Sequence, residues 1–72
     1  MQREPTLFDV IALLEDLPAR GLVRGQVGTI VEKLDGGFFE VEFSDNSGRT
    51  YAILPLRASQ FLVLHHDLAT VA

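Results

Sequence analysis

The sequence contains no cysteine. This absence excludes a disulfide framework and a zinc site built from thiolates. It also removes the thiol nucleophile, and the three serines, Ser44, Ser47 and Ser59, lie in turn-like segments with no histidine at a diagnostic spacing. A chain without cysteine fits a reducing compartment. We therefore expect a cytoplasmic protein that is not an enzyme and carries no cofactor.

Long hydrophobic runs are also missing. No stretch of about 18 apolar residues is present, which argues against a membrane-spanning helix. The first ten residues, MQREPTLFDV, have neither a basic segment followed by an apolar core nor a small-residue cleavage site, so no secretory signal is visible. We expect a soluble protein with no membrane partner.

Basic residues are few. Six Lys and Arg stand against ten Asp and Glu, which gives a formal net charge of −4. A molecule of this charge repels the phosphate backbone of nucleic acids rather than attracting it. The composition therefore disfavours a nucleic-acid partner and slightly favours a basic protein partner.

The chain is short but apolar enough to fold. It has 72 residues, near the lower limit for a domain without a disulfide or a metal, and 47% of them are hydrophobic. Such a composition is typical of a globular rather than a disordered chain. We expect one domain over residues 1–72, with a flexible arm at 1–6 and a tail at 66–72.

The clearest local pattern is a β-hairpin. Segments 27–34 and 38–43 alternate between two faces as strands do, and Asp-Gly-Gly at 35–37 supplies residues that reach positive φ in a tight reversal. In the first segment, alternation places Val27, Thr29 and Val31 on one face and Ile30 and Glu32 on the other. In the second segment, the apolar side has Phe39, Val41 and Phe43, and the charged side has Glu40 and Glu42. An isolated hairpin cannot bury such an apolar face, so further strands must cover it.

Three further strands are expected, at 9–14, 50–54 and 61–64, with a one-turn helix at 56–60. Segment 7–14 also has helical spacing, but its β-branched residues, and the acidic pair that would oppose a helix dipole at its end, favour a strand. Pro55 either ends the expected strand at 50–54 or places that strand at a sheet edge. The predicted fold is all-β, a small five-stranded SH3-like barrel with a one-turn helix before the last strand.

Particular motifs carry a family resemblance. Segment 24–31, RGQVGTIV, followed by VEF at 41–43, resembles the SH3-like barrels that include KOW modules and the nitrile hydratase beta-subunit barrel. With segments 8–18, 48–52 and 62–64 added, the chain from about residue 7 to 65 resembles the small bacterial family called domain of unknown function 4926. That resemblance implies a fold and no activity. Family members look like stand-alone small proteins, sometimes encoded beside toxin-like proteins, which implies a binding or antitoxin-like role.

Surplus apolar residues predict a protein interface. Phe38 and Phe39 are adjacent, so only one of them can point inward on a regular strand, and Phe38 must be covered by the termini, sit in a bulge or face a partner. Tyr51 and Ile53 alternate with inward residues, which makes their strand apolar on both sides. Arg49 lies near Tyr51, and Arg and aromatic residues are enriched at interface hot spots. We expect Phe38, Tyr51, Ile53 and Arg49 to bind a protein partner or a second copy.

Two other functions are weighed against this interface. A KOW-like nucleic-acid-binding barrel would use Arg20, Arg24 and Arg49, although KOW modules carry basic and aromatic residues where this chain carries acids. The nitrile hydratase resemblance implies an accessory barrel of an enzyme.

The remaining motifs are interpreted as structural. His65-His66-Asp67 has metal-ligand character, but adjacent strand residues point to opposite sides, so we predict no metal site. The carboxylates Glu15, Asp16, Glu40, Glu42 and Asp45 are expected on solvated surfaces rather than in a catalytic pair. Gly25 and Gly28 precede or lie within a β-branched strand rather than a helix, which favours a tight strand entry and a bulge over a phosphate-binding loop.

Overall fold

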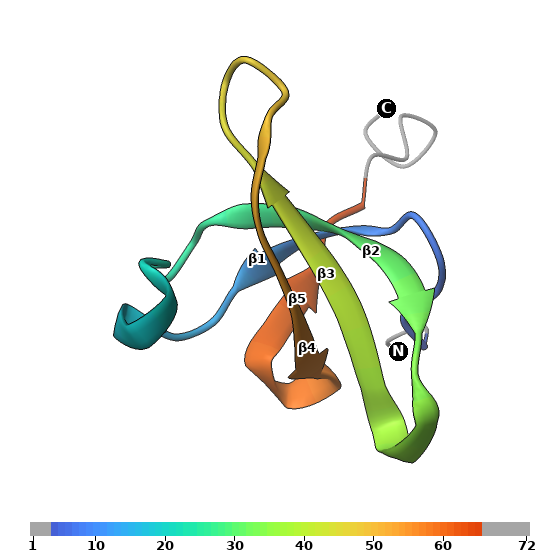
Figure 1. Cartoon of the computed structure of the whole chain (residues 1–72). Coiled ribbons are helices and arrows are strands. Elements are labelled where there is room, and N and C mark those ends of the chain that lie inside the picture. The colour runs from blue at the N-terminus through green and yellow to red at the C-terminus, as the bar shows by residue number, and fades with distance from the viewer. Residues whose placement is uncertain (1–3, 66–72) are drawn as a thin grey trace, which may run out of the picture.

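The computed structural model describes residues 4–65, which form an all-β unit (Figure 1). The strands are β1 (Val10–Leu13), β2 (Val27–Lys33), β3 (Phe38–Ser44), β4 (Thr50–Arg57) and β5 (Phe61–Val63). They make one antiparallel sheet in the order β4-β3-β2-β1-β5. Within the described residues no ladder joins β4 to β5, so the sheet is not closed by hydrogen bonds. The predicted five-stranded all-β fold is confirmed, and the relation to SH3-like barrels stays a prediction.

Strand β2 belongs to two parts of the sheet. Its first residues, Val27 to Thr29, pair with β1, and its residues from Thr29 to Lys33 pair with β3. Figure 1 shows β2 curving across the molecule between these two neighbours. The Phe39 ring of β3 meets the Phe61 ring of β5 edge to face, with centroids 5.8 Å apart. Because β3 and β5 are not sheet neighbours, this contact shows that the two parts of the bent sheet face each other across the core.

The core lies between these two parts. Alternation along the strands supplies most of its buried side chains, which are Ile11, Leu13, Ile30, Phe39, Val41, Phe43, Ala52, Leu54, Leu56 and Phe61. Leu22, in the connection between β1 and β2, is also buried in the core. Gly28 is required where β2 crosses Phe43, because a Cβ at this position would lie 2.9 Å from both the Phe43 ring and the Glu42 carbonyl oxygen. The predicted bulge is present in β2 but not at a glycine. It falls at Val31, between Ile30 and Glu32, whereas Gly25 (φ 90°) forms the tight entry to the strand.

The turns follow the predicted chemistry. Gly21 ends the short 3₁₀ turn η1 (Pro18–Arg20) in the left-handed region, and two glycines with positive φ reverse the chain in η2 (Asp35–Gly37). The predicted one-turn helix before the last strand is the 3₁₀ turn η3 (Ala58–Gln60). Strand β4 continues beyond Pro55 to Arg57, so the alternative in which this proline ends the strand is wrong. Because β4 is an edge strand, the missing proline donor is tolerated there.

A hydrogen-bonded turn precedes β1. The Thr6 amide donates to Asp9 Oδ2 (3.0 Å), the Asp9 amide donates to the Thr6 carbonyl (3.2 Å), and the Phe8 amide donates to the Ile30 carbonyl (2.7 Å). Phe8 has φ 69° and is 73% exposed. Thr6 therefore belongs to this turn rather than to the predicted arm at 1–6. The predicted tail at 66–72 lies outside the described residues.

Candidate interaction surfaces

The outer side of the β2–β3–β4 part of the sheet carries most of the predicted interface. We call it the acidic face, and its residues are Glu32, Phe38, Glu40, Glu42, Tyr51, Ile53, Pro55 and Arg57. Cross-strand pairing sets their neighbours, with Glu42 beside Ile53, Glu40 beside Pro55 and Phe38 beside Arg57. Side chains that are directly opposite on an antiparallel pair lie close enough to interact. This face therefore mixes carboxylates with apolar side chains.

The bulge in β2 brings two carboxylates together. Regular alternation predicts Glu32 on the same face as Ile30, and this prediction is wrong, because the extra residue Val31 shifts the register and pairs Glu32 with Glu40. Like charges directly opposite each other are destabilising. The third carboxylate of the face, Glu42, accepts a hydrogen bond from the Thr50 hydroxyl. The acidic face thus holds a like-charge pair where β2 and β3 meet.

Tyr51 and Ile53 lie as predicted on the outer side of β4. Each is 46% exposed, while Ala52, which lies between them, and Leu54, which follows Ile53, are buried. Arg20 Nη2 donates to the carbonyl oxygen of Ile53 (3.3 Å), so a side chain of η1 occupies part of the open edge of β4. Ile53 pairs with Glu42, whereas Tyr51 is the residue that the register skips between Ala52 and Thr50.

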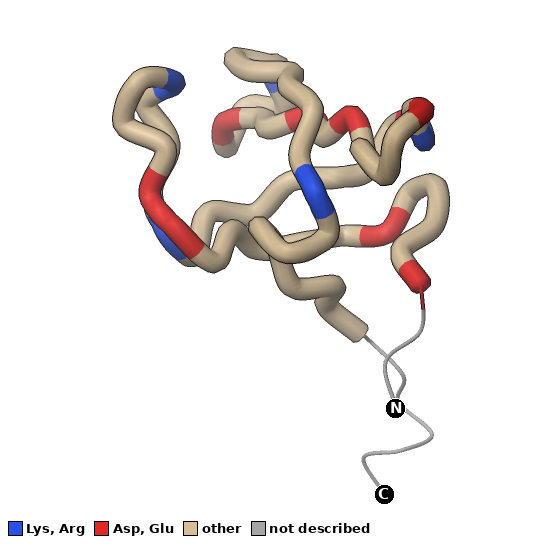
Figure 2. Tube along the Cα trace, turned by 90° about the horizontal axis from the view of Figure 1, so that it is seen from below, with Lys and Arg blue, Asp and Glu red and all other residues tan. Residues whose placement is uncertain are grey.

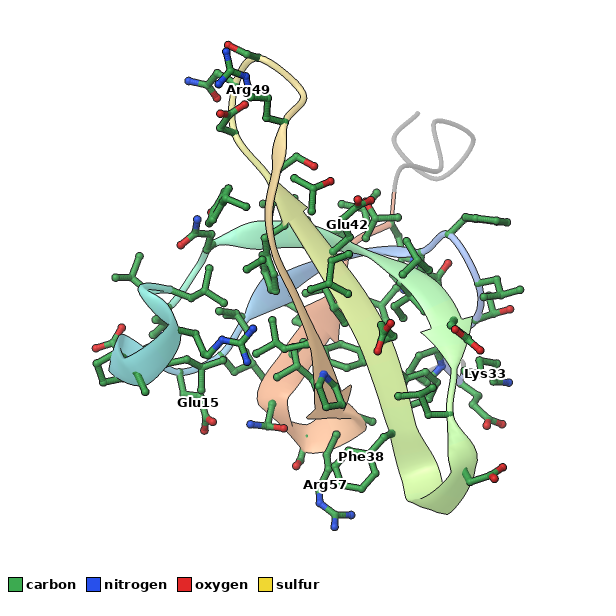
Figure 3. The ribbon with its side chains drawn as sticks, in the orientation of Figure 1. Glu15, Lys33, Phe38, Glu42, Arg49 and Arg57 are labelled. Atoms are coloured by element: carbon green, nitrogen blue, oxygen red, sulfur yellow. The ribbon has the colours of Figure 1, made fainter. Side chains whose placement is uncertain are left out.

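Phe38 and Arg49 lie at opposite ends of the β3–β4 pair (Figure 3). Phe38 is half-buried, and the Arg57 guanidinium carbon lies 4.3 Å from the centroid of its ring. Arg57 therefore covers this ring, a contact that the sequence analysis did not predict. Arg49 lies in the β3–β4 turn, where its amide donates to Asp45 Oδ1 (3.0 Å). The structure therefore separates Phe38 from Arg49, which lies two residues before Tyr51 in the chain.

The basic residues of the nucleic-acid alternative are separated. Arg20 lies in η1, Arg24 lies in the connection to β2, where its amide donates to Asp16 Oδ1 (2.8 Å), and Arg49 lies in the β3–β4 turn. Figure 2 shows the basic positions at separate points along the tube, several of them next to acidic ones. Within residues 4–65 they form no continuous basic stripe of the kind that follows a phosphate backbone.

A second surface was missed by the sequence analysis. It is the outer side of β1, β5 and the first part of β2, and we call it the uncharged face. Its residues are Val10, Ala12, Leu14, Val27, Thr29, Gln60, Leu62 and Leu64. Ala12 pairs with Val27 on one side and Leu62 on the other, so one apolar row crosses three strands. None of these eight residues is charged.

Exposure distinguishes this surface from the core. Leu14 is 46% exposed, Val27 is 51% exposed and Leu62 is 43% exposed. The inward residues of the same strands, Ile11 and Phe61 among them, already fill the core. One signal was available in the sequence, since segments 9–14 and 61–64 are apolar at nearly every position. Only the pairing of β1 with both β2 and β5 shows that their outer residues form one surface.

The comparison with protein families agrees with the family resemblance of the motifs. A family model described as Domain of unknown function (DUF4926) matches residues 7–63. The chain belongs to the DUF4926 family. The matched range contains all five strands of the DUF4926 domain, and hence most of both faces. No curated protein and no solved structure matches the chain.

Other polar groups of the DUF4926 domain have structural partners. Asp45 Oδ1 accepts from the amides of Ser47 (2.9 Å) and Arg49, and Glu15 Oε2 accepts from Gln60 Nε2 (3.0 Å). Within residues 4–65 no group of three or more His, Asp or Glu side chains is placed to hold a metal ion, and His65 is exposed. His66 and Asp67 lie outside the described residues. The same part of the chain contains no helix that is long and apolar enough to cross a membrane.

Proposed function

We propose that this DUF4926 domain is a non-enzymatic protein-binding module whose acidic face binds a basic protein partner. The observation that carries the proposal is the exposure of Tyr51 and Ile53, each 46% exposed on the outer side of β4, where Ile53 pairs with the glutamate Glu42 of β3. Aromatic residues are enriched at the energetic centres of interfaces, and charges around them select partners of opposite sign. A partner segment with apolar anchors flanked by Lys or Arg fits both features.

The carboxylates of the acidic face favour a cationic partner over a neutral one. Glu32 and Glu40 are paired directly across two strands, and the single cation among the eight residues of the face, Arg57, lies over the Phe38 ring. A Lys or Arg side chain from a partner that settles between the two carboxylates relieves their repulsion. Binding therefore adds a favourable charge contact to a site that is unfavourable in the free domain.

The edge of β4 favours docking on the sheet face rather than addition of a strand. Strand addition needs a row of free backbone donors and acceptors along an edge. Here Pro55 has no N–H, and Arg20 already donates to the Ile53 carbonyl. Proline and covering side chains are common protections of sheet edges. We therefore expect contact through side chains of the acidic face.

The proposal is tested with peptides displayed on a surface and selected for binding to the full-length chain. We expect selected peptides to combine apolar residues with Lys or Arg. The Tyr51→Ser, Ile53→Ser double variant should bind them at least tenfold more weakly, because it removes both apolar anchors. The Glu40→Gln, Glu42→Gln double variant should also bind more weakly and with less dependence on salt.

A control on the other face separates loss of the site from loss of the fold. The Leu62→Ser variant should bind the selected peptides with unchanged affinity. Selection of acidic peptides, or equal binding by all variants, would contradict the proposal. Retention of the chain on RNA that is lost in Arg20→Ala, Arg24→Ala and Arg49→Ala variants would instead support the nucleic-acid alternative.

A further inference from the structure

The uncharged face is more than a scatter of exposed apolar residues. Because Ala12 pairs with both Val27 and Leu62, an apolar row runs without a break across three strands, and Leu14 extends it along β1. Single exposed apolar side chains are normal on soluble proteins, whereas contiguous apolar patches mark interaction sites. The apolar character of these outward side chains is not needed for the domain's own core, because the inward residues of the same strands fill that core.

We propose that the uncharged face binds the same face of a second copy of this chain, giving a two-fold symmetric dimer. A two-fold contact places one patch against itself, so every charged residue near the centre of the patch approaches a copy of itself. Each copy carries a formal net charge of −4, and two copies repel each other over most of their surfaces. The uncharged face contains none of the ten acidic residues, which makes it the face through which like-charged copies can meet.

A partner of opposite charge fits this face less well than a second copy does. Recognition of a basic protein gains from carboxylates, and those on the sheet lie on the acidic face. Two carboxylates border the uncharged face: Glu15 accepts the hydrogen bond from Gln60 (3.0 Å), and Glu42 pairs with Thr29 where the two faces meet. This rim is polar and the centre is apolar, which is the usual anatomy of an interface. The dimer does not depend on the proposed function, since it uses a different face.

Sedimentation equilibrium of the full chain tests the dimer. We expect a concentration-dependent dimer for the unmodified chain and a dissociation constant at least about 100-fold weaker for Leu62→Glu, because that substitution places like charges in the contact. The matched control is Ile53→Glu, which adds the same charge at a similarly exposed strand position on the acidic face and should leave the dimer intact.

A rescue experiment removes misfolding as an explanation. Neither Leu62→Glu nor Leu62→Lys should associate well alone, and an equimolar mixture should form a heterodimer, since opposite charges then face each other. The proposal is overturned if the full chain stays monomeric at about 1 mM, or if Leu62→Glu dimerises as well as the unmodified chain. It is also overturned if Ile53→Glu weakens the dimer as much as Leu62→Glu does, or if the mixture of Leu62→Glu and Leu62→Lys stays monomeric. A chain that ends at His65 and dimerises when the full chain does not would also overturn it, because residues 66–72 rather than a second copy would then cover the face. The sedimentation experiment contains no basic protein partner, so the dimer can be disproved while the proposed function stands.

Discussion

The acidic face and the uncharged face are built by the same rule and have opposite character. Both consist of the outward side chains of strands whose inward side chains form one core. On β3 and β4 the outward positions include Glu40, Glu42, Tyr51 and Ile53, whereas on β1 and β5 no outward position is charged. The bent strand β2 contributes to both, with Val27 on one and Glu32 on the other. A small domain can thus present two different surfaces from a single sheet.

The two proposed partners follow from this difference in charge. Carboxylates concentrated on one part of a sheet give that part selectivity for cations and keep copies apart there. Their absence from the other part leaves a surface that hydrophobic contact can use. Variants on β2 and on the acidic face, together with changes in salt concentration, test whether the two surfaces are independent and whether their charge explains their partners.

The largest effect is expected where the two surfaces share a strand. In Gly28→Ala, a Cβ 2.9 Å from the Phe43 ring and from a backbone carbonyl forces β2 to shift, which should lower the free energy of unfolding by about 1–3 kcal/mol. Urea denaturation followed by circular dichroism measures this loss. Thr29→Ala, the outward neighbour on the same strand, is the control and should cost less than about 1 kcal/mol.

The Gly28→Ala variant also tests whether the two faces are coupled through β2. At a temperature where Gly28→Ala remains folded, peptide binding and dimer formation should fall together if the shift of β2 reaches both faces. Loss of only one of them would show that the two halves of the strand move independently. An unchanged unfolding free energy would show that Phe43 and the neighbouring backbone accommodate the methyl group.

Salt should move the two interactions in opposite directions. Between about 50 and 500 mM NaCl, the Debye length shortens from more than 10 Å to less than 5 Å. We expect binding of a basic peptide to weaken about tenfold, because its attraction to the carboxylates is screened. Dimerisation should strengthen about two- to fivefold, because screening reduces the repulsion between copies of net charge −4. Isothermal titration calorimetry measures the affinity for the peptide at each salt concentration, and sedimentation equilibrium measures the affinity of the dimer. If salt changed both affinities in the same direction, the assignment of partners to faces would be contradicted.

The elements of this fold could be predicted because their signals are local. Alternation along 38–43 and glycines at 36 and 37 are properties of a few consecutive residues, and the structure confirms both the strand and the reversal. The strand ends differ from prediction by one residue or so, except at β4, where Pro55 was expected to end the strand or lie at an edge and only the edge placement is found. The family was predicted from motifs spread over most of the chain and is confirmed.

The surfaces could be predicted only in part because they depend on pairing between distant strands. The outward placement of Tyr51 and Ile53 was predicted from alternation alone, and the structure confirms that both are exposed, whereas their role in binding stays a prediction. The pairing of Glu32 with Glu40 depends on one extra residue in β2, and the cover over Phe38 depends on the register that sets Arg57 beside it. The uncharged face depends on β1 lying between β2 and β5, and no short segment of sequence contains that information.

The smallest effect should come from the like-charge pair on the acidic face. Removing one charge in Glu32→Gln should raise the free energy of unfolding by about 0.2–1 kcal/mol at low salt, because the register places this carboxylate directly opposite Glu40. Thermal unfolding at two salt concentrations measures the gain, which should shrink as salt screens the repulsion.

A double-mutant cycle decides whether the gain comes from this pair. Glu40→Gln should give a similar gain, and the double variant should gain less than the sum of the two, because either substitution alone already removes the repulsion. Additive gains would mean that each glutamate responds to the overall negative charge rather than to its cross-strand neighbour. In that case the bulge at Val31 would not bring the two carboxylates into contact, and a partner cation placed between them would gain nothing from their proximity.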